Sequence, residues 1–257
     1  MIALILAGGL GTRLREETEF KPKPMVHIGG RPIIWHIMKN LSIQGIKEFC
    51  VATGYKGEIL KDYFLNYDLQ NTDLTLNLGE KSSIVSHGSH EESNWKVTIV
   101  DTGSLTMTGG RVFNALKYLD GDRFLCTYGD GLADIDLNAL IKFHLSHKKM
   151  ATVTAVKPLS RFGVMDLDQD GLVTEFREKP IMDSWVNGGF FIFEKGIKDY
   201  LDSECILEKE PLIKLAANGQ LIAYRHTGFW QPMDTIRESD LLNDLWNKGQ
   251  APWKNWT

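Results

Sequence analysis

The stretch that decides the fold begins with residues 2–7, which read IALILA, and continues through residues 8–14, which read GGLGTRL. Six consecutive apolar residues predict a strand that is buried on both faces, as in a parallel sheet. The glycines that follow allow positive φ angles and a close approach of the backbone to a ligand. Successive N–H groups in such a turn form a concave anion site, and Arg13 adds fixed donors for phosphate oxygens. We interpret this stretch as a phosphate-binding loop at the carboxyl end of the first strand, where open α/β sheets bind ligands.

Two familiar phosphate-binding motifs do not fit this loop. The dinucleotide fingerprint requires a third glycine, where the chain has Leu14, and an acidic residue about twenty positions further on, where residues 29–31 read GGR. The P-loop requires Lys followed by Ser or Thr, and the chain has Arg13 followed by Leu14. A nicotinamide-dependent oxidoreductase is therefore disfavoured.

A second basic motif follows in residues 21–25, which read KPKPM. The prolines favour an extended segment, so Lys21 and Lys23 should point to opposite sides. We expect one amine to face the phosphate-binding loop and the other to face solvent. A turn that merely links two elements has no use for such convergent cations.

Together with later stretches, these motifs resemble the signature of the sugar-1-phosphate nucleotidylyltransferases. The later stretches are YGDG at residues 128–131, GFWQPMDT at 228–235 and APWK at 251–254, so the resemblance covers essentially the whole chain. It implies an α/β fold, with a Rossmann-like, mixed, mostly parallel sheet flanked by helices and a small β-rich extension that binds the sugar (the nucleotide-diphospho-sugar transferase fold). We expect a single domain over residues 1–257. Its nucleotide-binding part spans about 1–150, its sugar-binding part about 151–235, and its C-terminal helix and tail 235–257.

The resemblance also implies a reaction. A nucleoside triphosphate, with CTP preferred, reacts with glucose 1-phosphate to give CDP-glucose and pyrophosphate. UTP or dTTP remains an alternative, because base choice depends on loop details. A catalytically silent sensor of nucleotide sugars is an alternative of another class, although a sensor has no need for both metal-binding carboxylates and the phosphate-binding lysine.

The residues expected to act follow from the same resemblance. Arg13, Lys23 and Lys179 are the expected catalytic residues, and Asp130 and Asp234 are the expected Mg²⁺ ligands. The expected nucleotide contacts are Leu6, Ala7, Gly8, Gly9, Leu10, Gly11, Thr12, Arg13, Lys23, Thr102, Gly103, Thr108, Arg111, Tyr128 and Gly129. The expected contacts of the sugar phosphate are Gly163, Glu178, Lys179, Asn187 and Gly188.

The residues alone leave several of these roles open. Asp130 lies between two glycines at the end of an apolar strand, which suits a ligand-binding carboxylate as well as a turn. Asp234 could instead cap the final helix, expected over residues 235–248. The pair Glu178 and Lys179 could instead form a surface ion pair, and residues 104–111 could simply lead into a helix.

Composition excludes several other classes. The 29 Lys and Arg residues nearly balance the 33 Asp and Glu residues, so no large basic face for nucleic acid is expected. No apolar run approaches the roughly 18 residues of a membrane helix, and the start lacks the features of a signal peptide, so we expect a cytoplasmic protein. Cys50 and Cys126 lie in strand-like runs and are expected in the core. The resemblance suggests a homo-oligomer, with a hexamer as one form, which composition does not test.

The remaining elements follow from hydrophobic periodicity. Helices are expected over 33–44, up to Phe64, up to Tyr118, and over 136–146, 194–201 and 210–219. Strands are expected over 49–53, 96–101, 123–128, 151–156, 173–177, 190–193 and 221–226. A mobile surface loop with one short strand, 74–76, is expected over 66–95. His36 is interpreted as structural, and His144 and His147 as a surface pair at a helix end.

Overall fold

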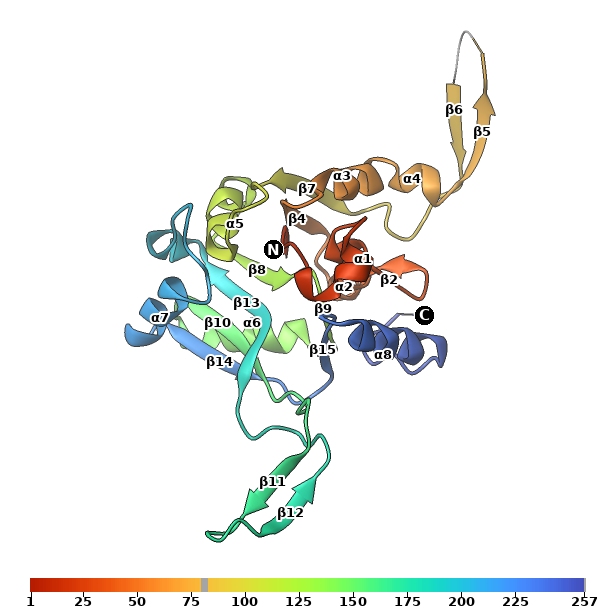
Figure 1. The fold of residues 1–257 in the computed structure, drawn as a ribbon. Helices are drawn as coiled ribbons and strands as arrows, with labels where there is room; N and C mark the ends of the chain where they lie inside the picture. Colours follow the sequence, from red (N-terminus) through yellow and green to blue (C-terminus); the bar gives the residue numbers. More distant parts are fainter. Residues whose placement is uncertain (80–82, 257) are drawn as a thin grey trace.

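The computed structural model describes residues 1–79 and 83–256; the predicted loop residues 80–82 lie outside this range. Its core is a seven-stranded sheet in the order β14-β10-β13-β8-β1-β4-β7 (Figure 1). The strands span, in that order, Leu221–Arg225, Ala151–Val156, Val186–Glu194, Arg123–Tyr128, Ile2–Ala7, Glu48–Thr53 and Lys96–Asp101. Only β13 runs antiparallel to its neighbours, β10 and β8. The mixed, mostly parallel sheet expected from the sequence is therefore confirmed.

Strand β1 lies inside the sheet, between β4 and β8, and all six of its residues are buried. Its side chains alternate between two cores. Ala3, Ile5 and Ala7 join the core on one face, and Ile2, Leu4 and Leu6 join the core on the other. A strand covered on both faces has no polar side, which explains its uninterrupted apolar sequence.

Helices cover both faces of the sheet. Residues of α2 (Ile33–Ile43), α3 (Gly57–Leu65), α6 (Leu137–His147) and α8 (Ile236–Asn247) belong to the first core. Residues of α5 (Thr108–Ala115), α7 (Glu210–Ala217) and the 3-10 helix η4 (Lys195–Tyr200) belong to the second. The segment expected as a helix over 194–201 is thus a 3-10 helix, and helix α5 continues as the 3-10 helix η3 (Leu116–Tyr118).

Short elements complete the fold near the first strand. They are η1 (Thr12–Leu14), α1 (Arg15–Thr18), η2 (Lys23–Met25), β2 (His27–Ile28) and β3 (Arg31–Pro32). Strand β9 (Gly131–Ala133) pairs in antiparallel fashion with β15 (Trp230–Pro232). The C-terminal tail also packs into the core: Trp253 is fully buried, and the ring of His36 lies edge-on to those of Trp246 and Trp253.

Two hairpins project from the body on opposite sides (Figure 1). One consists of β5 (Asp73–Asn77) and β6 (Ser83–His87), preceded by helix α4 (Tyr67–Gln70). The other consists of β11 (Val164–Leu167) and β12 (Val173–Arg177), which pair in antiparallel fashion. The expectation of a surface loop over 66–95 is therefore wrong where α4, β5 and β6 form, although the short strand expected over 74–76 lies within β5. Every residue of β5 and β6 is exposed, so no face of the hairpin needs an apolar alternation that would reveal it in the sequence.

The two histidines of α6 also differ from expectation. His144 is buried, not at the surface, and its two ring nitrogens lie 2.8 Å from Thr152 Oγ1 and 3.1 Å from Glu194 Oε1. His147 also bonds to Thr152. His36, interpreted as structural, is fully buried, and its Nε2 bonds to the carbonyl of Ile28 at 2.8 Å.

Cys50 and Cys126 are buried free thiols, as expected. Within the described residues, no helix combines the length and apolar character needed to cross a membrane.

Candidate active site

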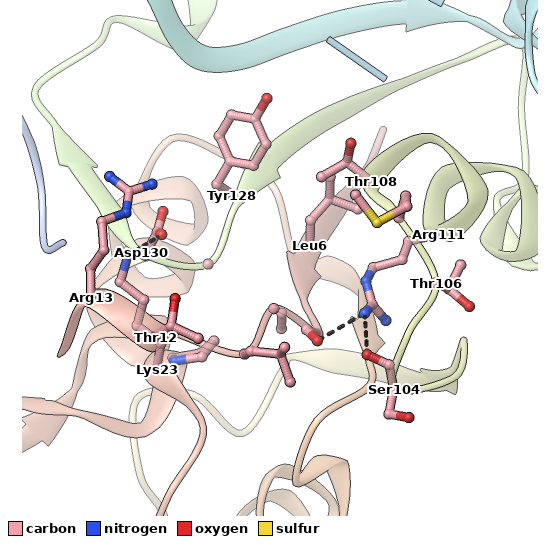
Figure 2. Close-up of a pocket in the computed structure, with 18 of the residues that line it drawn as sticks. Leu6, Thr12, Arg13, Lys23, Ser104, Thr106, Thr108, Arg111, Tyr128 and Asp130 are labelled. Carbon is pink, nitrogen blue, oxygen red and sulfur yellow. Dashed lines mark hydrogen bonds and ion pairs between the residues drawn. The ribbon is translucent and has the colours of Figure 1, made fainter. Parts of the chain in front are cut away.

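A cavity of about 480 Å³ lies at the carboxyl ends of β1 and β8. Figure 2 shows Arg13, Lys23 and Asp130 at one end of it and Ser104, Thr106 and Thr108 at the other. Its lining consists of Leu6, Ala7, Gly8, Gly9, Leu10, Gly11, Thr12, Arg13, Lys23, Pro24, Ser104, Leu105, Thr106, Met107, Thr108, Arg111, Tyr128, Gly129, Asp130 and Asp234. The structure thus brings the glycine loop together with the basic motif, both aspartates and the start of α5.

The glycine loop needs glycine for two different reasons. Gly11 has a φ of 63°, in the left-handed region that side chains disfavour. Gly8 has an ordinary φ, but a Cβ there would lie 2.1 Å from Nη1 of Arg111. Close approach of a buried guanidinium, and not backbone conformation, therefore explains the first glycine of the loop.

Arg111 reaches from α5 to the loop ends of three strands. Its guanidinium donates to the carbonyls of Thr53 and Gly103 at 2.9 Å, to that of Gly8 at 2.8 Å and to Thr102 Oγ1 at 2.6 Å. Figure 2 draws its bonds within the cavity lining, which include one to the carbonyl of Ser104. Burial lowers the pKa of Arg111. The N–H donors of Arg111 are therefore hydrogen-bonded to protein acceptors. The expected contact of Arg111 with the base or the phosphates stays a prediction.

Lys23 is the lysine of the KPKPM motif that faces the cavity. Its Nζ lies 2.6 Å from Oδ2 of Asp130 and 2.6 Å from Oδ1 of Asp234. Burial disfavours its charged form, but the two carboxylates outweigh burial, so the pKa of Lys23 is raised. Lys21 points elsewhere and pairs with Glu17. The prediction that only one of the two lysines faces the loop is confirmed, but the expected extended segment is wrong, because Lys23–Met25 forms the 3-10 helix η2.

The two aspartates meet because β9 pairs with β15. Asp130 directly precedes β9, and Asp234 follows β15 by two residues. Oδ2 of Asp234 also accepts from Nη1 of Arg13 at 2.7 Å. Burial alone would raise the pKa of Asp234, but Lys23, Arg13 and Arg161 lower it. Both carboxylates are thus held next to cations at the phosphate end of the cavity.

Asp234 does not cap the final helix. The N-cap of α8 is Thr235, whose hydroxyl accepts from the N–H of Glu238, while the Glu238 carboxylate accepts from the N–H groups of Thr235 and Asp234. This capping box leaves the Asp234 carboxylate available to the site. Sequence reasoning left the cap open as an alternative, and the structure assigns it to the next residue.

The aspartate pair fits a divalent cation. Oδ2 of Asp130 and Oδ1 of Asp234 each lie 2.6 Å from the ammonium nitrogen of Lys23, so the two carboxylates converge on the position of one cation. Carboxylate oxygens suit Mg²⁺, which takes one or two of them and completes its shell with substrate phosphates and water. Among the described residues, no group of three or more acidic, histidine or cysteine side chains is placed to hold a metal. The arrangement matches a metal that is shared with a bound nucleotide.

The loop before α5 contains residues that sequence reasoning missed. Ser104, Leu105, Thr106 and Met107 line the cavity. The predicted contacts Thr102 and Gly103 are not among the lining residues, and the Thr102 hydroxyl donates to the carbonyl of Thr53 at 2.6 Å. Part of the signal was available, because Ser104 and Thr106 continue the same stretch of small hydroxyl residues.

The predicted sugar-binding residues lie outside the cavity lining, in two groups. Gly163 and Glu178 are neighbours at the base of the β11–β12 hairpin, and Lys179 pairs with Glu178 at 3.1 Å. Asn187 and Gly188 begin β13, where Asn187 Nδ2 donates to the Tyr128 hydroxyl at 3.3 Å. The second group therefore contacts the cavity through Tyr128, whose pKa is raised by burial and by the charge of Glu208.

Arg161 and Glu208 are two further residues near the site that the sequence did not single out. Arg161 pairs with Glu238 at 3.1 Å and approaches Asp234 at 3.9 Å, so it brings a third cation toward the aspartates from the base of the hairpin. Glu208 accepts hydrogen bonds from Thr108 and Tyr128. Neither lies in a motif, and only the folded structure places them.

Sequence relatives are similar along the entire chain. A glucose-1-phosphate cytidylyltransferase of Salmonella typhi is 52% identical over 259 residues, covering 100% of both chains. A probable glucose-1-phosphate cytidylyltransferase of Bacillus subtilis is 44% identical, again over 100% of both chains. The resemblance inferred from the motifs is confirmed and extends to a particular branch of the family.

Solved structures share the architecture. HddC from Yersinia pseudotuberculosis superposes with a TM-score of 0.70 and 26% identity, covering 95% of this chain and 99% of that one. An apo UDP-glucose pyrophosphorylase superposes with a TM-score of 0.69 and 17% identity over 97% and 98% of the two chains, and supports the fold alone. A family profile described as nucleotidyl transferase matches residues 2–218. The glycine loop, the paired aspartates and these similarities agree, and the chain belongs to the nucleotidyl transferase family.

Proposed function

We propose that the chain transfers a cytidylyl group from CTP to α-D-glucose 1-phosphate, giving CDP-glucose and pyrophosphate. The observation that carries the proposal is the position of Lys23 between Asp130 and Asp234, at the end of a cavity that begins with a glycine loop. The names of the full-length relatives supply the base and the sugar.

The chemistry needs placement and charge neutralisation. A phosphate oxygen of glucose 1-phosphate forms a bond to the α-phosphorus of CTP, and the bond from that phosphorus to the α,β-bridging oxygen breaks. The electron pair leaves with pyrophosphate. Because the nucleophile is already an anion, no strong base is required; in-line positioning and stabilisation of the developing charge suffice.

In this proposal each cationic side chain of the site binds a different phosphate group. Arg13 binds the β- and γ-phosphates, which become pyrophosphate, and Lys23 stabilises the reacting phosphates. Lys179 pairs with the sugar phosphate, while Glu178, Gly163, Asn187 and Gly188 bind the sugar. Asp130 and Asp234 would hold Mg²⁺, which supplies Lewis-acid neutralisation of phosphate charge when bound.

In the same proposal, different parts of the chain bind the nucleotide and the sugar. Residues 1–150 bind the nucleotide, residues 151–235 the sugar, and residues 235–257 form the closing helix and tail. We also propose a homo-oligomer, which is supported by exposed apolar side chains on both projecting hairpins, such as Leu76, Ile84, Met165 and Phe176. Sedimentation analysis tests this assembly, and its hexameric form, directly.

Pyrophosphate release tests the proposed reaction. The protein is incubated with Mg²⁺, glucose 1-phosphate and CTP, UTP, dTTP, ATP or GTP in separate reactions. Release with CTP well above the others is the expected result. Preference for UTP or dTTP would keep the chemistry and overturn the base, whereas nucleotide binding without release would support the alternative of a sensor.

A further inference from the structure

We propose that Glu208 is a positioning residue that joins the nucleotide end of the cavity to the strand expected to bind the sugar. The carboxylate bridges two hydroxyl groups, one from helix α5 and one from the end of strand β8. Oε2 accepts from Oγ1 of Thr108 at 2.6 Å, and Oε1 accepts from the hydroxyl of Tyr128. Both partners line the cavity, whereas the exposed Glu208 is not among the lining residues.

The segment that carries Glu208 is docked by the backbone. The N–H of Gly110 donates to the carbonyl of Cys205 at 3.1 Å, and the N–H of Leu207 donates to Oγ1 of Thr108 at 3.0 Å. A Cβ on Gly109 would lie 2.4 Å from Sγ of Cys205. This close contact with the first turn of α5 fixes the backbone on which Glu208 stands.

The bridge decides what the two hydroxyls can offer a ligand. Each hydroxyl has a single proton to donate, and a carboxylate can only accept, so both hydroxyls use their donor on Glu208. Oxygen lone pairs remain. The Tyr128 oxygen already accepts a hydrogen bond from Nδ2 of Asn187 at 3.3 Å. Asn187 is the second residue of strand β13, which is expected to bind the sugar. The walls of the cavity therefore present acceptors, which recognise hydrogen-bond donors such as sugar hydroxyls.

The connection runs from Thr108 through Glu208 and Tyr128 to Asn187. It links the first turn of α5 to the end of β8 and the start of β13, two strands that are neighbours in the sheet. Because hydrogen bonds to a charged acceptor are strong, loss of the carboxylate frees Tyr128 and Thr108 to rotate. Through these two residues, Glu208 orients the acceptors without touching the reacting atoms.

Steady-state kinetics of Glu208→Ala, Glu208→Gln and Tyr128→Phe tests this inference, which rests on the proposed function. Glu210→Gln is the matched control, since Glu210 is an exposed carboxylate two residues further on. We expect Glu208→Ala to raise KM for glucose 1-phosphate roughly tenfold, as for loss of a hydrogen bond to a charged group. Glu208→Gln keeps one acceptor oxygen and should recover part of the loss. The control should stay within about twofold of the wild type.

A double variant separates positioning from mere packing. If Glu208 acts through Tyr128, Glu208→Ala combined with Tyr128→Phe should be little worse than either single variant. Multiplying effects, or Glu208→Ala kinetics within about twofold of wild type, would overturn the inference. Should Glu208→Ala fail to fold, Glu208→Gln carries the same comparison. If the wild type transfers no nucleotide, the proposed function fails, and calorimetric binding of CDP-glucose to wild type and Glu208→Gln still tests the role of Glu208.

Discussion

The backbone N–H of Met233 donates to the carbonyl oxygen of Asp130 at 2.8 Å. This bond extends the pairing of β9 with β15 and holds the backbones of Asp130 and Asp234 at a fixed separation. The distance between the two carboxylates is thus set by main-chain hydrogen bonds, and Lys23 fits between them. The site is assembled before any substrate arrives, which favours rate acceleration through preorganised charge.

Replacement of Lys23 by Ala should lower kcat at least 100-fold, because the reacting phosphates lose a placed cation. Lys21→Ala is the control, since that lysine lies two residues away and faces Glu17. Pyrophosphate release measures both. A Lys23→Ala enzyme with nearly wild-type turnover would remove Lys23 from the mechanism.

Asp130→Asn and Asp234→Asn should each raise the Mg²⁺ concentration needed for half-maximal activity, because an amide is a weaker ligand than a carboxylate. Asp240→Asn, an exposed change on α8, serves as the control. Activity titrated against Mg²⁺ at saturating substrates gives the comparison. Unchanged metal dependence in both variants would count against the assignment of these aspartates.

Gly8→Ala and Gly9→Ala should differ sharply. A Cβ at position 8 would lie 2.1 Å from the Arg111 guanidinium, whereas a Cβ at position 9 meets no atom within 4 Å. Displacing a buried guanidinium that serves several carbonyls should cost about 2 kcal/mol or more. Chemical denaturation should therefore show a loss for Gly8→Ala and a change within about 0.5 kcal/mol for Gly9→Ala. Equal stability of the two variants would contradict the inference that the Arg111 guanidinium, by its hydrogen bonds to the loops after three strands, stabilises the fold.

Acidification should destabilise the fold through His36. Burial lowers its pKa from 6.5 to about 4, because the fully buried ring would lose the hydration that stabilises its charged form; the hydrogen bond from Nε2 to the carbonyl of Ile28 opposes this shift without cancelling it. Between these two pKa values the unfolded chain binds a proton that the folded chain does not. Stability therefore falls as the pH drops below 6.5, by about 2 kcal/mol between pH 7 and pH 5.

The His36→Gln variant isolates this contribution. His27, His144 and His147 also have lowered pKa values, so they act in the same direction and persist in the variant. Urea unfolding at pH 7 and pH 5 should show a smaller pH difference for His36→Gln than for the wild type. An identical difference would assign the acid sensitivity to the other histidines.

The sequence patterns predicted those features of the fold that depend on interactions between residues close together in the chain. The apolar run of β1, the glycine loop and the opposite directions of Lys21 and Lys23 follow from rules that act over a few residues. The contact of Gly8 with Arg111 and the bridge from Glu208 to Tyr128 join distant segments, so no short-range pattern encodes them. The exposed β5–β6 hairpin was predicted only as the short strand 74–76, for another reason: a ribbon with solvent on both faces carries no amphipathic signature.

The separation of 211 residues between Lys23 and Asp234 has a consequence for biosynthesis. Strand β1 and the glycine loop are made well before residues 230–234, and Lys23 gains its second counter-charge only when those residues have been made and β15 has docked on β9. A nascent or truncated chain that stops before this point would hold a partly buried ammonium beside one carboxylate only. Competence for catalysis therefore depends on the docking of residues 230–234, which arrive long after Lys23 has been made.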